Sequence, residues 1–135
     1  MNEVTGKNEL SYTKRIVITG ANSGIGYFTT LDLVKLGHQV IMVCRNEEKA
    51  IKSKNKILNN VPEAKIDVII GDLSSIKKVQ DLATEIQKRY STIDVVIRNA
   101  GIWPMKRELN EDGLELSFMV NYLAIYILNR RLLKD

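Results

Sequence analysis

The fold of this chain is decided by the stretch Ile16-Val17-Ile18-Thr19-Gly20-Ala21-Asn22-Ser23-Gly24-Ile25-Gly26. An apolar segment runs directly into a turn with the glycine spacing G-x-x-x-G-x-G, and the turn opens a helix. The missing Cβ atoms allow a tight turn, a close approach of backbone to phosphate and close packing of helix on strand. Free N–H groups at the helix start would face an anion. The stretch therefore predicts a strand–turn–helix unit that holds a dinucleotide pyrophosphate.

Length and composition place the chain among single-domain globular proteins. It has 135 residues, 44% of them hydrophobic, and 20 Lys and Arg residues against 16 Asp and Glu residues, for a net charge of +4. The basic residues are scattered, which suits an anionic cofactor, and we expect no nucleic-acid partner. The one cysteine, Cys44, excludes an internal disulfide and a multi-cysteine zinc site. The polar start, residues 1–13, is expected to be flexible, with no secretory signal or membrane anchor, which favours an intracellular, cytoplasmic location.

Strand and helix signals alternate along the rest of the chain. Four segments are apolar and end at turn residues, so they are expected to be strands: Arg15–Thr19, Gln39–Val43, Lys65–Ile70 and Ile93–Arg98. Helices are expected at Ile25–Leu36, from a cap at Asn46 to about Asn59, along the apolar stripe Ile76–Tyr90 after a cap at Ser74, and at Asp112–Leu133.

Four β-α units in succession predict an α/β fold, a Rossmann-type doubly wound parallel sheet cut short at four strands. Right-handed crossovers give the strand order 3-2-1-4. In that order the chain reverses direction between the first and fourth strands, and ligands bind at the carboxyl ends beside such a point. Those ends carry Gly20 and Asn99.

Four short motifs extend this pattern and occur in a fixed order: Thr19–Gly26, Asp72-Leu73, Asn99-Ala100-Gly101 and Asn121. With them, residues 14–135 resemble the dinucleotide-binding N-terminal part of a short-chain dehydrogenase/reductase. The chain has about half the length of the domains that usually begin with this glycine motif. The stretches Val43–Asn46, Lys106–Leu109 and Glu111–Glu115 resemble the retinol-dehydrogenase-like members of that family.

The resemblance implies a role for each motif. The loop from Gly20 to Gly26 would wrap the pyrophosphate, with backbone amides and the Asn22 and Ser23 side chains as donors. Asp72 would accept from the adenine amino group and the Leu73 amide would add a contact, although an aspartate there is also a common turn residue. Asn99-Ala100-Gly101 would leave room for the nicotinamide ribose or be an ordinary strand-end turn, and Arg98 departs from the family's usual asparagine. The expected cofactor-binding residues are Gly20, Ala21, Asn22, Ser23, Gly24, Ile25, Gly26, Arg45, Asn46, Asp72, Leu73, Asn99, Ala100 and Gly101.

The choice of cofactor depends on the end of the second strand, where NAD enzymes place a carboxylate for the ribose hydroxyls. This chain has Cys44 followed by Arg45. A guanidinium can bond a 2′-phosphate in a bidentate way, so we expect NADP(H) in preference to NAD(H). The alternative is that Arg45 is an exposed loop charge.

The family's catalytic set is incomplete in this sequence. Asn121 matches its asparagine, but no serine on a fifth strand and no Tyr-x-x-x-Lys pair follow, and Tyr126 with Arg130 is interpreted as helix packing. Two hypotheses result: the NADP(H)-binding portion of an oxidoreductase for carbonyl or alcohol substrates, inactive alone, or a non-catalytic nucleotide-binding or dimerising module that regulates a full-length relative. Self-association or such pairing would use the last helix or the fourth strand. Trp103 is either a ligand contact or a packed loop anchor.

Overall fold

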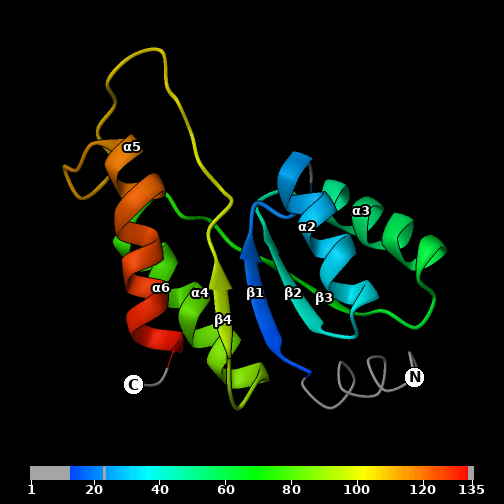
Figure 1. Ribbon diagram of the computed structural model, residues 1–135. Helices are drawn as coiled ribbons and strands as arrows, with labels where there is room; N and C mark the ends of the chain where they lie inside the picture. The colour runs from blue at the N-terminus through cyan, green and yellow to red at the C-terminus, as the bar shows by residue number, and fades with distance from the viewer. Residues whose placement is uncertain (1–12, 23, 134–135) are drawn as a thin grey trace.

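The computed structural model describes residues 13–22 and 24–133. Four strands, β1 (Arg15–Thr19), β2 (Gln39–Cys44), β3 (Lys65–Ile70) and β4 (Val95–Ile97), form one parallel sheet in the order β3-β2-β1-β4 (Figure 1). In the register, Ile16 lies beside Val40 on one side and Val95 on the other. The predicted doubly wound α/β fold and its strand order are confirmed.

Helices cover both faces of the sheet because side chains of each strand alternate between the faces. α2 (Gly24–Lys35) and α3 (Glu47–Asn60) pack on one face, and α4 (Ile76–Arg89) and α6 (Ala124–Leu132) pack on the other (Figure 1). Each face has its own buried cluster. Val17 contributes to the α4–α6 cluster and its neighbours Ile16 and Ile18 to the α2–α3 cluster. Burial on both faces explains why the strands are apolar over most of their length.

The two long middle helices begin at side-chain caps. Asn46 caps α3, as predicted, because its Oδ1 accepts a hydrogen bond from the Lys49 amide at 2.9 Å. The prediction that Ser74 caps the next helix is wrong: the cap of α4 is Ser75, whose Oγ accepts from the Lys78 amide at 3.3 Å. The amide of Ser74 is instead bonded to the Asp72 carboxylate, which holds Ser74 in the turn before the helix.

The fourth strand is shorter than predicted. The sequence predicts a strand over Ile93–Arg98, but the ladder to β1 covers only Val95–Ile97. Beyond it, the amides of Asn99 and Ala100 both donate to the Thr19 hydroxyl at 3.1 Å, so a side chain replaces the ladder and the chain turns away from the sheet.

The predicted last helix, Asp112–Leu133, is in fact three segments that begin later. α5 (Leu116–Phe118) leads into a π-helical turn, η1 (Met119–Leu123), and then into α6. The start is delayed because the Asn110 side chain accepts from the amides of Asp112 and Leu114 and folds this segment into a turn.

Two of the expectations fall on residues that lie outside the described part of the chain. These are the flexibility of the start, of which only Thr13 is described, and the role of Ser23. Within residues 13–22 and 24–133, no helix combines the length and apolar character needed to cross a membrane.

Candidate functional site

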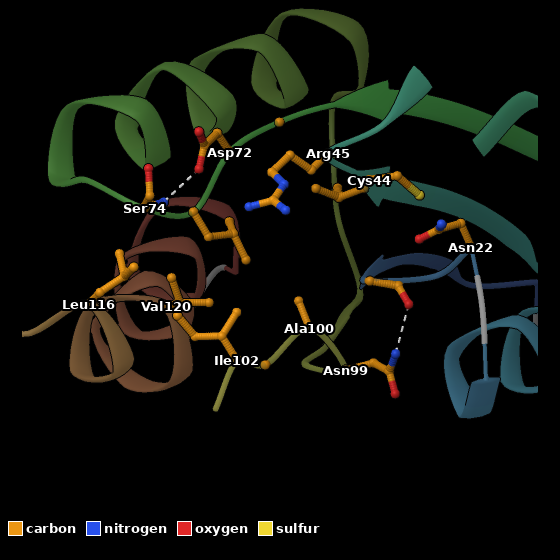
Figure 2. Close-up of a pocket in the computed structure, with 15 residues that line it drawn as sticks. Asn22, Cys44, Arg45, Asp72, Ser74, Asn99, Ala100, Ile102, Leu116 and Val120 are labelled. Carbon is orange, nitrogen blue, oxygen red and sulfur yellow. Dashed lines mark hydrogen bonds between the residues drawn. The ribbon is translucent and has the colours of Figure 1, made fainter. Parts of the chain in front are cut away.

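A cavity of about 440 Å³ lies at the carboxyl ends of the strands, where the sheet order predicts a ligand site (Figure 2). Its walls come from the turns after all four strands and from α5 and η1. The lining residues are Gly20, Asn22, Val43, Cys44, Arg45, Gly71, Asp72, Leu73, Ser74, Asn99, Ala100, Gly101, Ile102, Leu116 and Val120.

Gly20, which lines the cavity, and Gly26, which lies beneath it, leave no room for a side chain. Gly20 has φ of +64°, and a Cβ there would lie 2.8 Å from the Ala100 Cα. A Cβ on Gly26 would collide with the Asn99 side chain and the Gly20 carbonyl. The absence of both Cβ atoms therefore lets β1, α2 and the turn after β4 come together at one point.

Asn99 and Thr19 hold β1 and the turn after β4 together by hydrogen bonds. The Asn99 Nδ2 donates to the Gly20 carbonyl at 2.7 Å (Figure 2). The buried Thr19 hydroxyl accepts hydrogen bonds from the two amides that follow β4. The turns after β1 and β4 are thus held against each other, and together they form one side of the cavity.

Arg45, the first residue after β2, is exposed and lines the cavity. Figure 2 shows its guanidinium directed into the cavity interior, between Asp72 and Ala100. None of the residues in the described ranges forms an ion pair with it. An unpaired guanidinium facing a cavity is well suited to bind an anionic group.

Asp72 follows β3, the strand next to β2, and lies on the same side of the cavity as Arg45 (Figure 2). Its Oδ1 accepts from the Ser74 amide at 2.9 Å, and its Oδ2 lies 3.4 Å from the Lys78 ammonium. Burial disfavours the charged form, but the hydrogen bonds from Ser74 and the charge of Lys78 outweigh it and hold the pKa of Asp72 below its ordinary value. Asp72 is therefore an acceptor for hydrogen bonds at neutral pH.

Asn121 lies in the π-helical turn. Its Oδ1 accepts from the Ile102 amide at 2.8 Å, and its Nδ2 donates to the Ile102 carbonyl at 2.9 Å. The sequence left open that Asn121 only satisfies backbone groups at a helix kink, and in this structure both ends of its amide do so. The partner residue, Ile102, lines the cavity.

The structure brings together the strand-end part of the predicted cofactor set. Eight of the predicted residues line the cavity and five described ones do not: Gly24 and Ile25 start α2, Asn46 caps α3, and Ala21 and Gly26 are buried beneath the turn. Sequence reasoning missed several lining residues. Val43, Gly71, Ser74 and Ile102 flank the predicted motifs and could have been found from that proximity, whereas Leu116 and Val120 depend on where the last helix starts.

The structure also shows the surroundings of Cys44, His38 and Trp103. Burial raises the pKa of the Cys44 thiol to about 11, despite hydrogen bonds from the Ala21 and Asn22 backbone, so it stays protonated at neutral pH. His38 accepts a hydrogen bond from the Lys14 amide through Nδ1 at 3.0 Å. Trp103 is 93% exposed and is not a packed loop anchor in this structure.

Similarity to known proteins extends over nearly the whole chain. A family model described as short chain dehydrogenase matches residues 14–135. Retinol dehydrogenase 13 from Mus musculus is 34% identical over 120 residues, covering 89% of this chain and 36% of that protein. Dehydrogenase/reductase SDR family member 12 from Bos taurus is 38% identical over 120 residues, covering 89% of this chain and 38% of that protein. The chain thus spans just over a third of the length of these two curated relatives.

A similar solved structure includes a cofactor. The crystal structure of a metagenomic short-chain oxidoreductase in complex with NADP superposes with a TM-score of 0.74 at 26% identity, covering 88% of this chain and 54% of that one.

Proposed function

Because the chain belongs to the short-chain dehydrogenase family, we propose that its cavity binds NADP(H) in preference to NAD(H), as the cofactor-binding portion of an oxidoreductase for carbonyl or alcohol substrates. The observation that carries the proposal is the Arg45 guanidinium, which faces the cavity from the end of β2 without an ion-pair partner among the described residues. A carboxylate at that position would repel a 2′-phosphate, whereas a guanidinium attracts it.

The cavity wall fits an extended dinucleotide. The turn at Gly20 packs closely against Ala100, and α2 begins at Gly24, so the first backbone N–H groups of this helix would be available to a pyrophosphate beside the turn. Asp72 and Leu73 would hold the adenine, and Asn99, Ala100 and Gly101 the nicotinamide ribose. The bound nicotinamide would supply or accept the hydride. Asn121 would keep Ile102 and the turn after β4 in place beside it.

We propose that the chain by itself does not turn over substrate. A tyrosine with an ordinary pKa near 10 is a poor base at neutral pH, and the family's lysine four residues later would lower that pKa. None of the tyrosines in this sequence has a lysine four residues later. Saturable NADPH binding without oxidation of NADPH in the presence of aldehydes or ketones is the expected behaviour.

A non-catalytic module that pairs with a full-length relative is the second candidate. It is favoured by a row of exposed aromatic side chains at four-residue spacing along the last helical segments. Phe118 is 43% exposed, Tyr122 60% and Tyr126 53%, and the first two rings lie 5.4 Å apart. Co-purification of the chain with a full-length relative, lost in Tyr122→Glu, would support it. If the chain does not associate with a full-length relative, only the proposal of a cofactor-binding portion of an oxidoreductase remains.

The substitution Arg45→Ala tests the choice of cofactor. We expect it to weaken NADPH binding by about ten- to hundredfold, the range for charge-assisted hydrogen bonds, and to leave NADH binding nearly unchanged. Isothermal titration calorimetry with both nucleotides measures this. Lys49→Ala is the matched control, because Lys49 is an exposed cation nearby on α3 that does not line the cavity. Equal weakening of both nucleotides by Arg45→Ala would refute the assignment.

A further inference from the structure

The segment between β4 and α5 closes on itself before the last helix begins. Leu109 and Glu115 form an antiparallel bridge, and the Leu116 amide donates to the Glu108 carbonyl at 2.7 Å. Inside this loop the Asn110 amide donates to the Leu114 carbonyl at 2.7 Å. We refer to residues 108–116 as the clasp.

The Asn110 side chain joins the clasp to the turn after β3. Its Oδ1 accepts from the amides of Asp112 and Leu114, both at 2.9 Å, which shapes the clasp itself. Its Nδ2 points the other way and donates to the Ser74 carbonyl at 3.0 Å, across 36 residues of sequence. One side chain therefore orders the clasp and connects it to a residue of the cavity wall.

Ser74 in turn holds Asp72. The Ser74 amide donates to the Asp72 carboxylate, and both residues line the cavity (Figure 2). Asn110 does not line the cavity itself. The chain of contacts runs from Asn110 through the peptide groups of Ser74 to the carboxylate, so a displacement of Ser74 displaces the acceptor that faces the ligand.

We propose that Asn110 is a positioning residue of this cofactor site, which through Ser74 orients Asp72 toward the adenine end of the dinucleotide. The inference rests on the proposed function, because a bound dinucleotide is what gives Asp72 its partner. The clasp, which is far from the glycine turn in sequence, would thereby affect the affinity for the nucleotide.

The neighbouring residue Asp112 provides a matched control. Its Oδ2 accepts from the Ile76 amide at 3.0 Å, so it also connects the clasp to the start of α4. It has no bond to Ser74 or Asp72 among the described residues, and the hydrogen bond it accepts from the Asn110 Nδ2 is 3.5 Å long, against 3.0 Å for the bond from the same nitrogen to Ser74. A change at Asp112 therefore loosens the same clasp and the same helix without breaking the path to Asp72.

The experiment compares Asn110→Ala, Asp112→Ala and Asp72→Asn, with the double variant Asn110→Ala/Asp72→Asn, in the 135-residue chain. Calorimetric titrations use NADPH, adenosine 2′,5′-bisphosphate and nicotinamide mononucleotide. We expect Asn110→Ala to weaken NADPH and the adenosine bisphosphate by about tenfold, the effect of one misplaced hydrogen bond, and to leave the mononucleotide unchanged. Asp112→Ala leaves all three affinities unchanged. In the Asp72→Asn background the Asn110 substitution has a smaller effect, because the carboxylate that Asn110 orients is absent.

Amide hydrogen exchange without nucleotide separates this proposal from the cofactor assignment. Asn110→Ala should speed exchange at the Ser74 amide, and Asp112→Ala should speed it at Ile76 only. If the unaltered chain binds no NADPH but the exchange result holds, the proposed function fails while the coupling from Asn110 to Ser74 stands. Unchanged exchange at Ser74, equal losses in Asn110→Ala and Asp112→Ala, or additive effects with Asp72→Asn would each overturn the positioning role.

Discussion

At the residue scale, Thr19 and Cys44 show how the ends of two buried strands differ in chemistry. The Thr19 hydroxyl is fully buried and receives two amides, so it fixes the turn on the β4 side of the cavity. Cys44 is also buried and lines the cavity, but its thiol stays protonated. The cavity therefore presents the charges of Arg45 and Asp72 and no thiolate.

The raised pKa of Cys44 predicts a loss of stability at alkaline pH. The thiol has a pKa of about 11 in the folded chain against its ordinary value of 9.0, so between these values the folded state keeps a proton that the unfolded state releases. The protonated thiol makes its full contribution to the free energy of unfolding below pH 9, and this contribution is lost as the pH rises toward 11. Urea unfolding of the chain and of Cys44→Ala across this range measures it. Cys44→Ala should show a smaller fall in unfolding free energy, although Tyr90, whose pKa burial and Asp67 also raise, still titrates in both proteins. If the free energies of unfolding of the chain and of Cys44→Ala fell in parallel with pH, the raised pKa of Cys44 would be contradicted.

At the scale of elements, Asn121 links the last helical segments to the turn after β4. Both ends of its amide are bonded to the backbone of Ile102, so Asn121→Ala leaves a peptide unit without its partners. We expect a loss of about 1–3 kcal/mol in the free energy of unfolding, together with faster exchange of the Ile102 amide. Asn129→Ala, an exposed asparagine on α6, is the control. A stability in Asn121→Ala equal to that of the control would show that this link is unimportant.

Elements specified by local pattern were predictable from the sequence, and elements specified by distant side chains were not. β1 and β3 match the predicted bounds because each is a largely apolar run that ends at turn residues. The end of β4 depends on the Thr19 hydroxyl, and the start of the last helix on Asn110; no hydrophobic pattern encodes either contact. The same holds for the site. Arg45 and Asp72 follow from their places at strand ends, whereas Leu116 and Val120 reach the cavity only through the clasp and the π-helical turn.

At the scale of the whole molecule, the two edges of the sheet differ in the polarity of their side chains. On the β3 edge the half-buried Asp67 carboxylate accepts from the Tyr90 hydroxyl at 2.5 Å, and a charge placed at an edge discourages pairing with another chain. The β4 edge has three apolar residues, Val95, Val96 and Ile97, and Val95 is 37% exposed. An apolar edge of this kind favours association.

We therefore expect the isolated chain to self-associate through β4. Val95→Lys places a charge on that edge and should shift the population toward monomer in sedimentation velocity experiments over a wide range of concentrations. Ile51→Lys is the matched control, since Ile51 is 45% exposed on α3, on another part of the surface. A chain that is already monomeric at every concentration would contradict this expectation.

A titration of the purified chain with NADPH and with NADH tests directly whether the cavity binds NADP(H). Trp103 is the single tryptophan, so its fluorescence can report binding near the loop that follows β4, and the melting temperature is measured in the same samples. We expect saturable binding of NADPH, weaker binding of NADH and a melting temperature that rises with NADPH concentration, since a ligand of the folded state stabilises it. Unchanged melting temperature and no saturable binding of either nucleotide would contradict NADP(H) binding by the cavity.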